Sequence, residues 1–135
     1  MAVFILKDAS LTVNAVSLST YVTSISLAYE TDSVEVTSMG SNGHVFTGGL
    51  QNIRCDVTLN QDFAASQVAA TLDALVGTTT TVVIKPTSAA VSATNPSYTI
   101  TNAFLAATQP VNGSVGDLAS MSVSFTGGSL VKATS

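Results

Sequence analysis

Apolar and polar residues alternate with a period of two along most of this chain, and β-branched residues carry much of the pattern. Such alternation is typical of strands that bury one face. It is clearest at residues 53–61 and 119–126, where the apolar phase predicts a buried face and the polar phase an outward one. The two polar phases consist of Arg54, Asp56, Thr58 and Asn60 in the first segment and Ser120, Ser122, Ser124 and Thr126 in the second.

Further strands are expected at residues 22–30, 79–85 and 98–107. A short hairpin is expected around Asn14 and Ala15, between two β-branched segments. The alternation changes phase near Asn102, which predicts a β-bulge there. Strands therefore dominate the pattern.

One segment breaks the period of two. Between about Phe63 and Val76, apolar residues recur at helical spacing in an alanine-rich stretch, with Asp62 as a possible N-cap and Gly77 as a possible left-handed C-terminal residue. One domain is expected over residues 1–135, because its length suits a single core. The predicted fold is mainly β, a β-sandwich or small barrel with one flanking α-helix.

Two segments lie outside this pattern. Residues 37–49, TSMGSNGHVFTGG, form a long run of small and flexible residues between two expected strands, and we expect a flexible loop. Residues 129–135 follow a pair of glycines, and we interpret them as a possible C-terminal arm that becomes ordered on contact with a neighbour.

Charged residues make up only 9% of the chain, against about 25% in ordinary soluble domains. Because charged residues are depleted in the cores of protein interfaces, this composition favours self-assembly over a weakly charged monomer. The net charge of −4 disfavours a protein that binds nucleic acid by neutralising phosphates. The N-terminus MAVFIL lacks the pattern of a signal peptide, and no apolar run is long enough to span a membrane.

The residues give little support for catalysis or for a metal or cofactor site. Cys55 falls in a buried phase, which favours a packed core cysteine. His44 is the single histidine and has no carboxylate among its sequence neighbours, so we expect a surface or contact residue. Asp32 and Glu35 do not match the ligand spacing of a calcium loop, so we expect solvated acids. We predict no enzyme, no catalytic residue, no metal and no cofactor.

The order of segments resembles the tail tube proteins of phages with long, non-contractile tails. The resemblance begins with LTVNAVSLSTYVTSISLAYETDSVEVTSMG at residues 11–40. It continues through GGLQNIRCDVTLNQDF, LDALVG, NPSYTITNAFL and QPVNGSVGDLAS, and so extends over residues 11–128. The same fold superfamily includes the tube proteins of type VI secretion.

This resemblance implies a structural virion protein. Six copies would form a ring, and stacked rings would form a tube with a weakly acidic lumen that conducts DNA, without binding it specifically, during ejection. Tape measure and tail terminator proteins would be the further partners, with assembly in the host cytoplasm, a final place in the virion tail, and no membrane contact. The loop between the rings would comprise Ser38, Met39, Gly40, Ser41, Asn42, Gly43, His44, Val45, Phe46, Thr47 and Gly48.

The two polar strand faces, at residues 54–60 and 120–126, are expected at the lumen or at a seam between subunits, with plain solvent exposure as the alternative. Other functions remain open. A head–tail joining or head-decoration protein would also be strand-rich and self-associating, and a secreted adhesin-like β domain is a third possibility.

Overall fold

The computed structural model describes residues 5–65 and 67–135. Within them, eight strands form one antiparallel sheet. The strands are β1 (Ser10–Val13), β2 (Val16–Ser17), β3 (Val22–Glu35), β4 (Phe46–Asn60), β5 (Thr78–Lys85), β6 (Ser97–Leu105), β7 (Ser120–Thr126) and β8 (Ser129–Ala133). A 3-10 helix η1 (Ser19–Tyr21) and an α-helix α1 (Val68–Asp73) complete the described elements.

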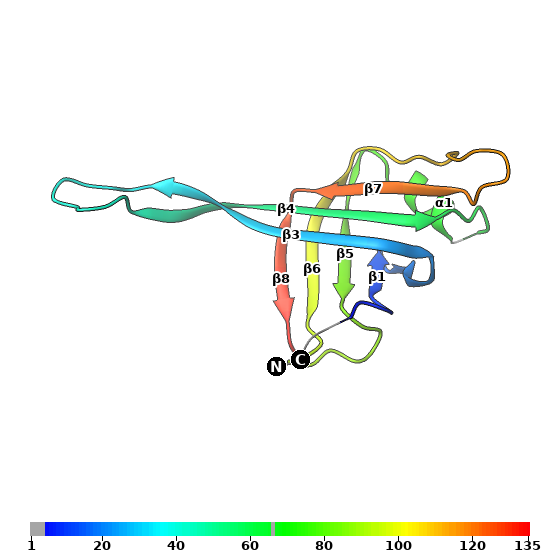
Figure 1. Cartoon of the computed structure of the whole chain (residues 1–135), viewed down its shortest axis with the longest axis horizontal. Helices are drawn as coiled ribbons and strands as arrows, with labels where there is room; N and C mark the ends of the chain where they lie inside the picture. Colours follow the sequence, from blue (N-terminus) through cyan, green and yellow to red (C-terminus); the bar gives the residue numbers. More distant parts are fainter. Residues whose placement is uncertain (1–4, 66) are drawn as a thin grey trace.

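The sheet folds over on itself at β6. Its order is β2-β1-β5-β6-β7-β4-β3, and β8 also pairs with β6. In Figure 1 the layer of β3, β4 and β7 crosses the layer of β1, β5, β6 and β8. The end strands β2 and β3 do not pair, so the sheet is a sandwich of two layers and not a closed barrel. The predicted mainly β fold with one helix is confirmed, and the barrel alternative is wrong.

The core lies between the two layers. The apolar phases expected at residues 53–61 and 119–126 are confirmed as buried, with Val57 of β4 and Phe125 of β7 each 1% exposed. Leu11, Val82 and Ile100 face them from the other layer. Burying each such side chain contributes about 1.5–3 kcal/mol, so the alternation in sequence supplies the main energy that holds the layers together.

Two turns confirm local predictions. Asn14 and Ala15 both have positive φ, at 51° and 66°, and form the two-residue turn between β1 and β2. Asn102 has a φ of 63°, and the register between β5 and β6 shifts beside it, as the change of phase predicted. The bulge lets β6 pair with β8 before it and with β7 after it.

The predicted C-terminal arm at residues 129–135 is wrong. Residues 129–133 are strand β8, which pairs with β6 and buries Leu130. The two glycines do not end the structured chain but reverse it, because Gly127 and Gly128 have φ of 77° and 82°. A Cβ on Gly128 would lie 2.2 Å from the carbonyl oxygen of Thr101, so only glycine fits this corner.

The helix is shorter than predicted. It comprises six residues, against a prediction from about Phe63 to Val76, and one residue of that range, 66, lies outside the described residues. The predicted N-cap at Asp62 is wrong, since the N-cap is Gln67. The Asp62 carboxylate instead accepts hydrogen bonds from the Ala64 amide and the Tyr21 hydroxyl, which hold the chain in a non-helical turn. Gly77, with a φ of 80°, takes the predicted left-handed conformation.

The expectation that no signal peptide is present concerns in part residues 1–4, which lie outside the described residues. Over the rest of the chain, the single α-helix falls far short of the length needed to cross a membrane.

Candidate functional site

The two predicted polar strand faces lie side by side on the outer side of the β3, β4 and β7 layer. The antiparallel register of β4 and β7 places each residue of one set directly opposite a residue of the other. The pairs are Arg54 with Thr126, Asp56 with Ser124, Thr58 with Ser122, and Asn60 with Ser120. The structure therefore brings all eight predicted residues together on one surface, opposite the core.

The neighbouring strand β3 extends this surface with residues that were not among the predicted site residues. Ser24, Ser26 and Ala28 pair with Thr58, Asp56 and Arg54, so they share the same side of the layer. We call the twelve residues the polar face: the eight above together with Ser24, Ser26, Ala28 and Glu30. The alternation at residues 22–30 predicts a polar side for this strand, but the sequence does not show that the strand pairs with β4.

Hydrogen bonds across the strands hold the centre of the polar face. Asp56 accepts hydrogen bonds from the Ser124 hydroxyl at 2.5 Å and from Arg54 Nε at 3.0 Å. The Ser124 hydrogen bond and then Arg54 lower the pKa of the Asp56 carboxyl. Arg54 and Asp56 thus form an ion pair at the surface, and small hydroxyl groups surround the pair on the polar face.

The predicted loop at residues 37–49 is mostly the end of a long hairpin. Strands β3 and β4 continue beyond the sandwich and pair as far as Glu35 and Phe46, so residues 46–49 belong to β4 and the loop between strands is residues 36–45. The loop boundaries were wrong because the glycines at positions 48 and 49 obscure the alternation. We call residues 31–50 the hairpin arm, and Figure 1 shows it projecting far from the sandwich.

Every residue of the hairpin arm is exposed. Its large apolar side chains have no core to pack against, and Met39 at the tip is fully exposed. These side chains are Val34, Val36, Met39, Val45, Phe46 and Leu50. A two-stranded hairpin alone is marginally stable in water, so contact with another surface would stabilise this arm.

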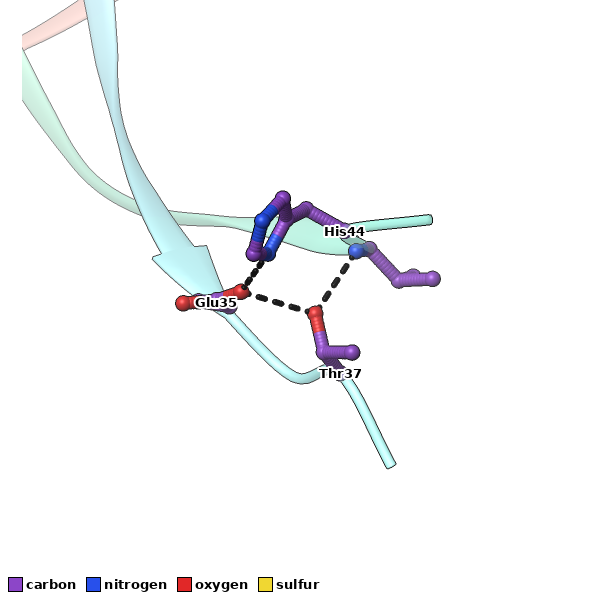
Figure 2. A network of polar contacts seen from close by, with 4 residues as sticks. Glu35, Thr37 and His44 are labelled. Atoms are coloured by element: carbon purple, nitrogen blue, oxygen red, sulfur yellow. Dashed lines mark hydrogen bonds and ion pairs between the residues drawn. The ribbon is translucent and has the colours of Figure 1, made fainter. Parts of the chain in front are cut away.

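The end of the hairpin arm carries a small polar network (Figure 2). His44 Nδ1 lies 2.5 Å from Glu35 Oε2, and the Thr37 hydroxyl donates to the same oxygen at 2.9 Å. Thr37 also accepts a hydrogen bond from the Val45 amide. His44 is exposed, as expected for a surface residue, and the hairpin register brings Glu35, nine residues away in sequence, into contact with it. The His44 contact and then Thr37 lower the pKa of Glu35.

The remaining candidates do not assemble into a reactive site. Cys55 is fully buried, as predicted, and burial followed by the nearby Asp56 charge raises its pKa to about 12. Asp32 and Glu35 are three residues apart in β3 and so point to opposite sides of the strand. Among residues 5–65 and 67–135, no group of three His, Cys, Asp or Glu side chains has the geometry to hold a metal ion.

Comparison with known proteins gives fold-level matches. No family model matches the chain, and no curated protein matches it closely. A chain of the sheath/tube terminator of the extracellular contractile injection system PVC superposes with a TM-score of 0.71 at 11% identity, over 98% of this chain and 97% of that one. A chain of the tube-terminating cap of the anti-feeding prophage gives 0.68 at 12% identity, over 100% and 95%. A chain from the virion of a native gene transfer agent gives 0.66 at 13% identity, over 93% and 95%.

These superpositions extend over nearly the whole of each chain, so they concern the complete fold. The chain has a tail-tube-type fold. The resemblance in the order of segments is therefore confirmed for the fold.

Two other surfaces of this tail-tube-type fold expose apolar side chains. The first is a groove of about 400 Å³ at the open edge of the sandwich, between β3 and the adjoining ends of β5 and β6. The second brings Phe63, which follows β4, against Val111 on the connection between β6 and β7. Val115 and Leu118 of the same connection are also exposed. Neither surface was predicted from the sequence, because each joins segments that are distant in the chain.

Proposed function

We propose that this protein is a subunit of a phage tail tube of the long, non-contractile type. Six copies form a ring, rings stack into a tube, and DNA passes through the lumen during ejection. The observation that carries the proposal is the polar face, a continuous wall of small polar side chains backed by a hydrophobic core. The non-contractile tail type rests on the sequence resemblance alone.

The electrostatics of the polar face suit a conduit. It carries Glu30, Arg54 and Asp56 among small polar or apolar residues, and Arg54 is paired with Asp56. A wall with many free cations would neutralise phosphates, and these contacts would add up along a tube and retain the DNA. A weakly acidic wall screened by salt lets the polymer slide.

The hairpin arm is assigned to the contact between rings. It includes all the residues of the predicted inter-ring loop, from Ser38 to Gly48, and its large apolar side chains are exposed. Tape measure and tail terminator proteins are the further proposed partners. Assembly would take place in the host cytoplasm, and the final location would be the virion tail.

Electron microscopy of the purified protein tests the assembly. Long uniform tubes with six-fold rings are the expected result. Persistent monomers, or isolated rings that do not stack, would contradict the proposal.

Labelling of engineered cysteines tests which surface lines the lumen. Ser122→Cys lies on the polar face, and Ala70→Cys lies on the exposed side of α1 as the matched control. In assembled tubes a small maleimide is expected to label both positions, whereas a bulky polymer-linked maleimide labels only position 70. The buried Cys55 gives no background. Equal labelling by the bulky reagent would show that the polar face is outside the lumen.

A head–tail joining or head-decoration protein remains the second candidate, also without enzymatic activity. It would share the exposed apolar surfaces but form a single closed ring or bind a shell. The same micrographs distinguish it from the tube subunit.

A further inference from the structure

We propose that the hairpin arm of one copy binds in the apolar groove beside β3 of another copy. This inference rests on the proposed function in assuming that copies associate, and it names the surface that receives the arm. Three observations support it: the apolar lining of the groove, the opposite charges of the groove and the arm, and the direction in which the arm projects.

The groove combines an apolar floor with a basic rim. Its lining includes Leu6, Ile25, Leu27, Ile84 and Tyr98. Three lysines surround it: Lys85 lines it, Lys132 lies over the Tyr98 ring with Nζ 6.0 Å from the centroid, and Lys7 lines the adjoining hollow that shares Leu6 and Ile25. Asp8 lines the same hollow and accepts a hydrogen bond from Ser88. The rim therefore has three lysines and one carboxylate, and its charge is positive overall.

The hairpin arm and its root have the opposite charge. The hairpin arm has two carboxylates, Asp32 and Glu35, and neither lysine nor arginine, and Glu30 of the polar face lies at its root. The one histidine of the arm, His44, contacts Glu35. Val34 lies on the same side of β3 as Asp32, and Phe46 pairs with Glu35 on the other side. Val36 is exposed directly after the strand. The arm therefore offers apolar side chains flanked by carboxylates, and the groove offers an apolar floor flanked by ammonium groups. Opposite charges around an apolar contact favour encounter and fix its register.

The direction of the arm requires that its partner be another molecule. Strands β3 and β4 run on continuously from the sandwich, and Figure 1 shows the arm directed away from the body that carries the groove. A contact between two different surfaces of identical copies can repeat from one copy to the next.

Charge also distinguishes the groove from the second apolar surface. The surface on the β6–β7 connection is lined by Asp117, with Asp62 next to its exposed Phe63, and its lining contains no lysine or arginine. Acidic groups there would repel the acidic arm, even though Val115 is fully exposed.

Charge-swapped variants and cysteine crosslinks test the contact. One variant reverses the arm with Asp32→Lys and Glu35→Lys, and a second reverses the groove with Lys85→Glu and Lys132→Glu. Each then carries like charges on both surfaces, while a 1:1 mixture restores opposite charges between copies. The crosslink joins Thr47→Cys on an arm to Leu6→Cys at the groove of a size-tagged copy, under mild oxidation. Val115→Cys, which is more exposed than Leu6, replaces the groove cysteine as the control.

We expect arm–groove dimers with native charges and in the mixture of the two swapped variants. The yield should fall on the order of tenfold in either swapped variant alone, and the position 115 control should give background yield. An unchanged yield of crosslinked dimer in the charge-swapped variants, or an equal yield through position 115, would overturn the inference. Crosslinks that appear only after removal of residues 1–4 would assign the groove to the chain's own N-terminus and also overturn it.

Electron microscopy of the same samples separates this inference from the proposed function. Tubes without arm–groove crosslinks would refute the inference and leave the tube assignment standing. Arm–groove crosslinks without tubes would refute the tube assignment and leave the contact standing.

Discussion

Removing the end of the hairpin arm should abolish assembly and leave the subunit folded. Ser33 and Gly48 are paired across the hairpin. The fourteen residues 34–47 can therefore be replaced by an Asn-Gly turn without changing the register of the β3–β4 pairs between Ser33 and the sandwich. All the removed residues are exposed, and none contributes to the core.

The effect on the free energy of unfolding should be small because two terms oppose each other. Shortening the connection from fourteen residues to two lowers the entropy cost of closing it by about 1.7 kcal/mol. Loss of the Val34–Thr47 and Glu35–Phe46 pairs costs roughly 0.4–2 kcal/mol. The net change should therefore stay within about 2 kcal/mol, as measured by urea unfolding of the unassembled subunit.

The effect on assembly should be large. The excision removes five exposed apolar side chains, and burying their exposed parts would contribute about 1 kcal/mol each, or roughly 5 kcal/mol per contact before the cost of association. We expect no sedimenting tubes. A matched variant that keeps the arm length, with Val34→Thr, Val36→Thr and Val45→Thr, should weaken assembly to an intermediate degree.

Two results would refute this reasoning. Normal tubes from the excised subunit would show that the arm makes no essential contact. A loss of several kcal/mol in the free energy of unfolding would show that the arm supports the sandwich, contrary to its complete exposure.

Three further predictions concern stability and titration. Gly128→Ala should lower the free energy of unfolding by about 3 kcal/mol or more in urea unfolding. Gly127→Ala should lower it by about 1 kcal/mol, because its added Cβ meets no atom within 4 Å. Equal losses in the two variants would show that the backbone at Gly128 does not need glycine. The Cys55 thiol should resist alkylation at pH 8 until the protein unfolds, because it is buried and its pKa is raised to about 12; rapid labelling of folded protein would be inconsistent with this. His44→Ala should raise the pKa of Glu35 toward its ordinary value, as followed by NMR. Since the pKa of Glu35 is lowered in the fold, its contribution to order at the tip is present above the ordinary glutamate pKa and is lost as the pH falls through the lowered one. An unchanged titration in the variant would count against the contact.

The sequence predicted the parts of the fold that depend on local alternation. The faces of β4 and β7 were predicted correctly because one side of each strand is uniformly apolar and buried. The turn at Asn14 and the bulge at Asn102 were also predicted, since each leaves a local mark in the sequence.

The errors arose where pairing partners decide the structure. Strand β8 was missed because its short segment has one buried residue, Leu130, and depends on the edge of β6. The hairpin arm was taken for a loop because no core imposes alternation on it. The contact between His44 and Glu35 depends on the hairpin register, which the bulge between the pairs of Thr31 and Ser33 sets. The groove could not be predicted, because its walls come from strands that are adjacent only after folding.

The continuity of β3 and β4 has a mechanical consequence. Each strand is at least fourteen residues long, about 46 Å at the usual rise, and serves the sandwich at one end and the projection at the other. No loop or hinge separates the two parts, and the one irregularity between them is a bulge. A load applied at the tip is therefore borne in shear by the ladder of backbone hydrogen bonds and reaches the body directly. Once the tip is held by another copy, the two strands would act as a lever, in which displacement at one end tilts the sheet surface at the other.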